Sequence, residues 1–253
     1  MADRPLALVT GSVRRIGRAI VEDLSRHGFD VALHCHGSRD EADVIAASLT
    51  QNGARVEVFG GNLTVAGAGA ALIGEVAAAM GPLRLLVNNA SIFEDDEMGT
   101  LGEAQFDLHF AIHVKAPVFL AEAFAAQLPA GLDGLIVNII DQRVWRPNPK
   151  FFSYTLSKAT LWAATRTMAQ ALAPLIRVNG IGPGPTLKNT RQTDEDFKKS
   201  TDGLLLQHGP ELSEFGATIR YLWEAKSVTG QMIALDGGQH LAWETPDILG
   251  VAE

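Results

Sequence analysis

Short apolar runs alternate with longer amphipathic segments along most of the chain. The runs that we interpret as strands lie at residues 6–10, 31–34, 55–59, 83–88, 135–140, 176–181 and 232–235. Segments with apolar residues at helical spacing lie at residues 16–27, 40–51, 66–80, 103–128 and 152–173. Because the strands are apolar almost throughout, they suit a parallel sheet with helices on both faces. The pattern therefore predicts an α/β fold with a doubly wound, seven-stranded parallel sheet in the order 3-2-1-4-5-6-7.

The alternation lapses once, at about residues 186–208, where the chain is polar and charged. This segment follows the sixth predicted strand, at the carboxyl edge of the sheet, where ligands bind in such folds. We expect a mobile lid over the substrate; the alternative is a surface helix exposed to solvent. The chain contains no linker-like stretch and no repeat, so residues 1–253 are predicted to form a single domain.

The chain has 253 residues, of which 47% are apolar and 20% charged, and a net charge of -8. An acidic chain binds nucleic acid or an anionic membrane poorly, so we expect neither as a partner. Cys35 is the single cysteine, which excludes an intrachain disulfide. The N-terminus does not resemble a signal peptide, and no apolar run approaches the ~20 residues of a membrane helix. We therefore expect a cytoplasmic protein.

Two glycines lie in the turn between the first strand and the first helix. Gly11 allows a tight turn and Gly17 allows close packing of the helix, so backbone N–H groups can face a pyrophosphate. Ile16, next to Gly17, is expected to contact the cofactor as well. Arg15 lies between the glycines, where its guanidinium can reach a phosphate or an electron-rich substrate ring. The alternatives are an ordinary turn and a surface arginine.

The end of the second strand indicates which nicotinamide cofactor is bound. An acidic side chain there would bind the free ribose 2′-hydroxyl of NADH. This chain has His36, Ser38 and Arg39 instead, which offer hydrogen-bond donors and positive charge for a 2′-phosphate. We therefore predict NADPH/NADP rather than NADH as the cofactor.

Tyr154 and Lys158 are four residues apart at the start of a predicted helix, so both side chains lie on one helical face. An ammonium group near a phenol favours the phenolate, so we expect Lys158 to lower the pKa of Tyr154 from about 10 towards neutrality. Tyr154 would then donate a proton to the substrate as hydride arrives from the nicotinamide. The spacing by itself also fits the start of an ordinary amphipathic helix.

Further motifs follow the other strands in the same order along the chain. They lie at carboxyl ends of strands, which meet at one edge of a parallel sheet, so we expect a single site. The motif residues are Asn89, Ala90 and Ser91 after the fourth strand, Asp141 after the fifth, and Pro183, Gly184 and Thr186 after the sixth.

With these motifs the chain resembles the short-chain dehydrogenase/reductase family over nearly its whole length. The resemblance implies a Rossmann fold, with Tyr154 as proton donor and Lys158 as its partner. It also implies that Asn62 and Leu63 flank the adenine of the cofactor. Members of this family usually form tetramers through two long helices and the last strand, so we expect a homotetramer. Further implied cofactor contacts are Asn89, Ala90, Pro183, Gly184 and Thr186.

Four departures from the common family pattern resemble the pteridine reductase branch, which includes bacterial dihydromonapterin and dihydrofolate reductases. They are Asp141 in place of a serine, Arg15 in place of a glycine, the Ser91-x-Phe93 pattern and the His36-x-Ser38 pattern. The resemblance implies that Arg15 and Ser91 contact phosphate and pterin, and that Phe93 stacks on the pterin. Asp141 is implied to work beside Tyr154, where it can help relay a proton to a ring nitrogen.

We therefore predict an oxidoreductase that transfers hydride from NADPH to a dihydropterin, dihydrofolate or dihydromonapterin. One alternative is a carbonyl reductase for a 3-oxoacyl, sugar or steroid ketone, in which Asp141 is a neutral substitution. Another is a nucleotide-sensing regulator without catalysis, which would not need both Tyr154 and Lys158. His113, where the family usually has an asparagine, is expected to be a buried structural residue or a proton relay.

Overall fold

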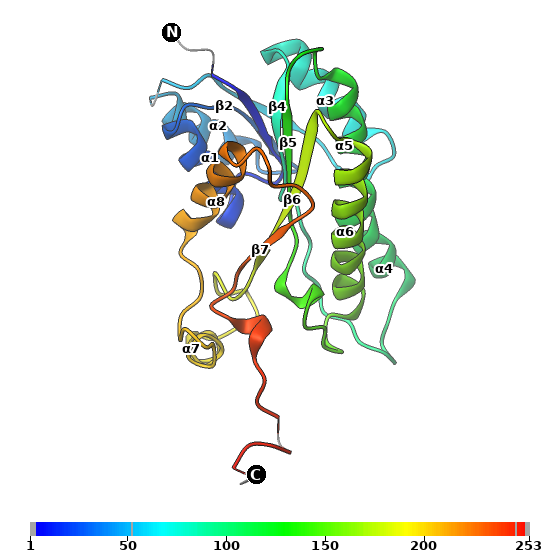
Figure 1. Ribbon diagram of the computed structural model, residues 1–253, viewed down its shortest axis with the longest axis vertical. Coiled ribbons are helices and arrows are strands. Elements are labelled where there is room, and N and C mark those ends of the chain that lie inside the picture. The colour runs from blue at the N-terminus through cyan, green and yellow to red at the C-terminus, as the bar shows by residue number, and fades with distance from the viewer. Residues whose placement is uncertain (1–3, 52, 246, 251–253) are drawn as a thin grey trace.

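In a computed structural model, which describes residues 4–51, 53–245 and 247–250, seven parallel strands form one sheet (Figure 1). The strands are β1 (Leu6–Val9), β2 (Asp30–Cys35), β3 (Val56–Gly60), β4 (Leu83–Asn88), β5 (Gly134–Ile139), β6 (Ile176–Pro183) and β7 (Met232–Leu235). Their order is β3-β2-β1-β4-β5-β6-β7, so the predicted topology is confirmed. Residues 1–3 and 251–253 of the predicted domain lie outside the described residues.

Helices cover both faces of the sheet (Figure 1). They are α1 (Arg15–Arg26), α2 (Arg39–Thr50), α3 (Ala68–Met80), α4 (Glu103–Phe110), α5 (Ala116–Gln127), α6 (Phe152–Ala171), α7 (Asp194–Asp202) and α8 (Leu212–Glu224). One face packs against α1, α2 and α8, and the other against α3, α5 and α6. The doubly wound arrangement with helices on both faces is therefore confirmed.

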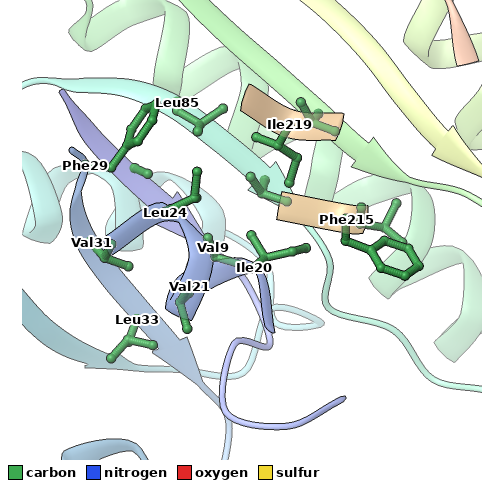
Figure 2. Packing of buried hydrophobic residues seen from close by; sticks show 14 of the residues in the cluster. Val9, Ile20, Val21, Leu24, Phe29, Val31, Leu33, Leu85, Phe215 and Ile219 are labelled. Atoms are coloured by element: carbon green, nitrogen blue, oxygen red, sulfur yellow. The ribbon is translucent and has the colours of Figure 1, made fainter. Parts of the chain in front are cut away.

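The two largest apolar cores among the described residues, one on each face of the sheet, explain why the strands are apolar at successive positions. Ala7 and Val9 of β1 belong to the core under α1 and α8 (Figure 2). Leu6 and Leu8 of the same strand point to the opposite face and belong to the core under α3 and α5. The first core includes Ile20, Leu24, Phe215 and Ile219, and the second includes Leu72, Ile73, Leu120 and Phe124.

Helix α8 was not predicted from the sequence. Its buried residues Phe215, Ile219 and Leu222 follow helical spacing, and Glu211 and Glu214 form a capping box at its start. The signal is therefore present, but it directly follows the polar stretch in which the alternation of strands and helices lapses. The helix packs against α1 and completes the cover of that face of the sheet.

The predicted helix at residues 103–128 is interrupted, because a π-helical turn, Ala111–Lys115, separates α4 from α5. Such turns often mark functional sites, and His113 lies buried in this one. Glu103–Gln127 as a whole is long and apolar enough to span a membrane by length and composition, which was not anticipated. Here it packs as a core helix, with Leu120 and Phe124 buried against the sheet and α3.

Candidate active site

A cavity of about 1160 Å³ opens at the carboxyl edge of the sheet. The turns after β1, β4, β5 and β6 all contribute to its wall. The predicted site residues in this wall are Gly11, Arg15, Ile16, Gly17, His36, Asn62, Leu63, Asn89, Ala90, Ser91, Phe93, Asp141, Tyr154, Lys158, Pro183, Gly184 and Thr186. Two other predicted residues, Ser38 and Arg39, are not among the described residues that line the cavity. The strand-end motifs thus surround one space.

Gly17 is the position at which the glycine turn tolerates no side chain. A Cβ atom there would lie 2.3 Å from the carbonyl oxygen of Gly11 and 2.5 Å from Nδ2 of Asn89. Gly11 has a left-handed backbone, with a φ of +62°, which favours glycine. This close approach leaves the N-terminus of α1 at the cavity, where its free N–H groups suit a phosphate.

Thr10 and Asn89 join the end of β1 to the end of β4. Nδ2 of Asn89 donates hydrogen bonds to the carbonyl oxygens of Thr10 and Gly11, both at 2.9 Å. The backbone N–H groups of Asn89 and Ala90 donate in turn to Oγ1 of Thr10, at 2.9 and 3.0 Å. These four hydrogen bonds fix the glycine turn relative to the segment that follows β4.

Arg15 contacts the segment that was predicted to be a lid. Its guanidinium donates to the carbonyl oxygens of Leu187 and Lys188, at 3.0 and 2.9 Å. Arg191, farther along the same segment, donates from Nη2 to the carbonyl oxygen of Phe93 at 2.8 Å. The segment is therefore attached to both the glycine turn and the stretch after β4.

Of the three residues after β2 that were predicted to bind the 2′-phosphate, one lies in the cavity wall. His36 lies in the cavity wall, but Ser38 is the N-cap residue of α2. Arg39 begins that helix and pairs with Asp43 at 3.2 Å. Arg14, which was not predicted, also lies in the wall. It directly precedes Arg15 in the glycine turn, which is the signal that could have identified it.

His34, inside β2, ties the glycine turn to the end of β3. Its Nδ1 accepts a hydrogen bond from the N–H of Gly11 at 3.3 Å, and its Nε2 lies 3.0 Å from the carbonyl oxygen of Gly61. These partners assign a neutral ring with its hydrogen on Nε2. Burial lowers the pKa of His34 from 6.5 to about 4.

We expect His34 to make the folded protein less stable in acid. Below pH 6.5 the unfolded chain takes up a proton here, whereas the folded chain stays neutral down to about pH 4. The stabilisation is therefore fully present above pH 6.5 and falls through this window, by about 3 kcal/mol. Urea unfolding across the window should show a smaller loss for His34→Gln, whose amide can keep both hydrogen bonds. The exposed His208→Gln is the control, and an unchanged pH dependence in His34→Gln would contradict this expectation.

Tyr154, Asp141 and Lys158 lie together at the start of α6. The Tyr154 hydroxyl donates to Oδ2 of Asp141 at 2.9 Å, and Oδ1 of Asp141 accepts from the N–H of Arg143 at 2.8 Å. Nζ of Lys158 donates to the carbonyl oxygen of Ile139 at 2.8 Å. The same nitrogen lies 5.7 Å from the centroid of the Tyr154 ring. The structure thus brings the phenol, the carboxylate and the ammonium into one cluster.

Burial controls the pKa values in this cluster. It lowers the pKa of Lys158 from 10.5 to about 8 and raises the pKa of Asp141. The pKa of Tyr154 is raised well above its usual value, first by burial and then by the charge of Asp141. The predicted lowering of the Tyr154 pKa by Lys158 is therefore wrong. The phenol is therefore protonated, as a proton donor must be, although its raised pKa makes it a weaker acid than a free tyrosine.

Phe93 places an aromatic surface next to Tyr154. Its ring centroid lies 4.7 Å from that of Tyr154 and 4.2 Å from that of Phe151, on which it stacks. The guanidinium carbons of Arg143 and Arg191 lie 5.7 and 5.4 Å from the Phe93 centroid. The two arginines were not predicted, because they belong to no motif and only the fold brings them to Phe93.

Comparisons with known proteins identify relatives that match most of the chain. A family model described as short chain dehydrogenase matches residues 5–199. The chain is 58% identical to FolM alternative dihydrofolate reductase 1 of Brucella suis, solved in complex with NADP, with a TM-score of 0.95 over 98% of this chain and 100% of that one. Pteridine reductase 1 of Leishmania tarentolae is 30% identical, over 94% of this chain and 96% of its own.

A relative with a different activity is also similar. The 3-oxoacyl-acyl-carrier-protein reductase of Staphylococcus epidermidis is 28% identical, over 93% of this chain and 98% of its own. The family model covers well over half of the chain, and the residues that carry the family motifs lie around one cavity. The chain therefore belongs to the short-chain dehydrogenase/reductase family of oxidoreductases.

Proposed function

We propose that this protein uses NADPH to reduce a pterin-type substrate such as a dihydropterin, dihydrofolate or dihydromonapterin. The observation that carries the proposal is the 2.9 Å hydrogen bond from the Tyr154 hydroxyl to the Asp141 carboxylate, beside the ring of Phe93. These groups combine a proton source, an acceptor for a substrate N–H group and a surface for a flat ring. Similarity to the Brucella suis protein, which is named a dihydrofolate reductase, supports the proposal.

The glycine turn and the cavity fit a dinucleotide. The space that a Cβ atom at Gly17 would fill is occupied by backbone, and the cavity of about 1160 Å³ exceeds the ~300–1,000 Å³ of ordinary single-ligand sites. When bound, NADPH supplies the hydride. We assign its contacts to Gly11, Arg15, Ile16, Gly17, His36, Ser38, Arg39, Asn62, Leu63, Asn89, Ala90, Ser91, Tyr154, Lys158, Pro183, Gly184 and Thr186.

Tyr154 supplies the proton that reduction of a carbon–nitrogen double bond requires. Its hydroxyl stays protonated because burial and Asp141 raise its pKa. When a substrate nitrogen takes the proton, the positive charge of Arg143 favours the remaining phenolate, and Nζ of Lys158 lies 5.7 Å from the centroid of its ring. The N–H of Arg143 holds Asp141 in place, so that its carboxylate can accept a hydrogen bond from the substrate.

Reduction of a ketone is the second candidate function, favoured by the similarity to the Staphylococcus epidermidis reductase. That reaction develops negative charge on an oxygen next to Tyr154. Both oxygens of Asp141 accept hydrogen bonds, from the Tyr154 hydroxyl and from the N–H of Arg143, so this side chain suits a substrate N–H group better than a ketone oxygen. The acceptor at position 141 therefore favours the pterin.

We also propose that residues 186–208 close over the substrate and that the protein works as a homotetramer in the cytoplasm. The hydrogen bonds of Arg15 and Arg191 support the closure, because they already attach this segment across the cavity.

Apolar side chains exposed on two helices, Phe119 of α5 and Leu156 of α6, support the assembly into a homotetramer. The net charge of -8 argues against nucleic acid or an anionic membrane as a partner.

A substrate panel tests the proposed reaction. We expect kcat/KM for NADPH oxidation with dihydropterins, dihydromonapterin or dihydrofolate to exceed that with 3-oxoacyl thioesters by at least ~10-fold. Asp141→Ser should reduce this ratio, because a serine removes the carboxyl acceptor for a substrate N–H group and can itself donate a hydrogen bond to a ketone oxygen. Brisk ketone reduction by the wild type, with no turnover of any pterin, would refute the pterin substrate and favour the carbonyl reductase.

A further inference from the structure

His113 connects the buried interior to a residue of the cavity wall. It is 1% exposed, with Nδ1 at 2.8 Å from Oγ of Ser157 and Nε2 at 2.9 Å from Oγ of Ser91. The N–H of Ile92 also points at Nε2, at 3.3 Å. Ser157 is fully buried, whereas Ser91 lies in the wall. The contacts of His113 therefore reach the place where a substrate would bind.

The partners of His113 assign the hydrogen on its ring. A backbone N–H can only donate, so Nε2, which faces the N–H of Ile92, must offer its lone pair. Burial holds the pKa of His113 well below its usual value, so the ring is neutral and carries its hydrogen on Nδ1. Nδ1 donates to Ser157, whose own hydroxyl donates to the carbonyl oxygen of Tyr154 at 2.7 Å. The Ser91 hydroxyl therefore donates to Nε2 at 2.9 Å rather than to the carbonyl oxygen of Ile92, which lies farther away at 3.5 Å.

The same arrangement occurs one helical turn earlier, at His109. The N–H of Glu94 donates to its Nε2 at 3.4 Å, and its Nδ1 lies 2.6 Å from Oγ of Ser153, which donates to Asp96. The two histidine rings stack with centroids 5.6 Å apart. Each histidine thus holds the segment after β4 by one backbone N–H, and both carry the hydrogen on Nδ1. Ser153 is buried and does not reach the cavity.

We propose that His113 is a positioning residue that fixes the direction of the Ser91 hydroxyl. Because the Ser91 hydroxyl donates its hydrogen to Nε2 of His113, Oγ of Ser91 presents lone pairs to the cavity and accepts hydrogen bonds from the ligand. As an acceptor, Oγ of Ser91 favours a substrate edge that carries N–H or amino groups. It disfavours a carbonyl oxygen, to which it has no hydrogen left to donate. The inference rests on the proposed function, since a pterin carries such donors and a 3-oxoacyl chain does not.

Neutron diffraction from deuterium-exchanged crystals tests the hydrogen positions directly. We expect deuterium on Nδ1 of both His113 and His109, and on Oγ of Ser91 along the line to Nε2. Deuterium on Nε2 of His113 would overturn the inference, whatever substrate the protein reduces. Because this measurement does not depend on activity, it separates failure of the inference from failure of the proposed function.

A double-mutant cycle tests the consequence for substrate binding. Ser91→Ala and His113→Leu should each raise KM for the dihydropterin about tenfold, the effect of one lost hydrogen bond, while kcat changes less than about threefold. The double variant should be no worse than either single variant, because both changes remove the same interaction. His113→Gln, whose amide offers an acceptor and a donor, should recover most of the loss.

His109→Leu is the matched control for this cycle. His109 is as buried as His113 and lies on the same helical face, but its serine partner does not reach the cavity. The fold-increases in KM caused by His109→Leu and by Ser91→Ala should therefore multiply in the variant that carries both. If His113→Leu and Ser91→Ala multiply to about 100-fold, the inference is overturned. If the wild type reduces no pterin, the proposed function fails, and the deuterium positions alone decide the role of His113.

Discussion

Replacing Tyr154 by phenylalanine is expected to lower kcat at least ~10²-fold. The change removes only the hydroxyl that donates to Asp141, and it keeps the ring that packs against Phe93. Without this hydroxyl the proposed substrate nitrogen has no placed proton donor, so the proton must come from water that no side chain holds in position. Steady-state NADPH oxidation at saturating substrate measures the loss.

Tyr221 provides the matched control, because it is the other tyrosine of the chain and is 55% exposed on α8. Tyr221→Phe makes the same chemical change away from the cavity and should keep the wild-type kcat. Affinity for NADPH, measured by fluorescence titration, should change by less than about twofold in either variant. Near-normal turnover by Tyr154→Phe would mean that another group supplies the proton.

A single methyl group at position 17 should abolish tight cofactor binding. The added Cβ would lie 2.3 Å from the carbonyl oxygen of Gly11 and 2.5 Å from the Asn89 amide, so α1 or the turn after β1 must move. Either movement misaligns the N–H groups that face a phosphate. We expect Gly17→Ala to raise the Kd for NADPH at least ~100-fold and to lower the free energy of unfolding by about 1–3 kcal/mol. Isothermal titration calorimetry and urea unfolding measure the two effects.

Gly74→Ala is the control for this substitution. Gly74 lies within α3, and among the described residues an added Cβ there would meet no atom within 4 Å apart from the nearby backbone of its own helix. Alanine in an open helical position should leave NADPH binding unchanged and stabilise the fold by roughly 0.5–1 kcal/mol. Wild-type affinity in Gly17→Ala would show that the turn can rearrange and that this glycine is not needed for the cofactor.

The sheet could be predicted from the sequence because its strands are buried on both faces. A strand such as Leu6–Val9, in which every residue is apolar, fits few positions other than the middle of a parallel sheet. Structural details that depend on contacts between distant parts of the chain could not be predicted from local sequence patterns. The π-helical turn at Ala111–Lys115 is one example, since the serines that His109 and His113 contact lie 44 residues farther along the chain.

The candidate site could be predicted where its residues belong to motifs at strand ends. Asp141 belongs to such a motif, and Tyr154 and Lys158 form a motif of their own at the start of α6, the helix that follows the same strand. The pKa of Tyr154 was predicted in the wrong direction, because spacing along a helix reveals a nearby charge but not the extent of burial. Arg143 and Arg191 border Phe93 only through the path of the chain after β5 and after β6, which no local pattern in the sequence specifies.

The four hydrogen bonds that join Thr10 and Gly11 to the backbone and side-chain amide of Asn89 and to the N–H of Ala90 have a consequence for engineering this enzyme. They hold the glycine turn, where we propose that the dinucleotide binds, against the stretch that carries Ser91 and Phe93, so the spacing between the proposed cofactor and substrate sites is set inside the scaffold. Substrate preference can therefore be redesigned through the outer loops, at Arg143 or Arg191, while Thr10 and Asn89 preserve the reacting geometry.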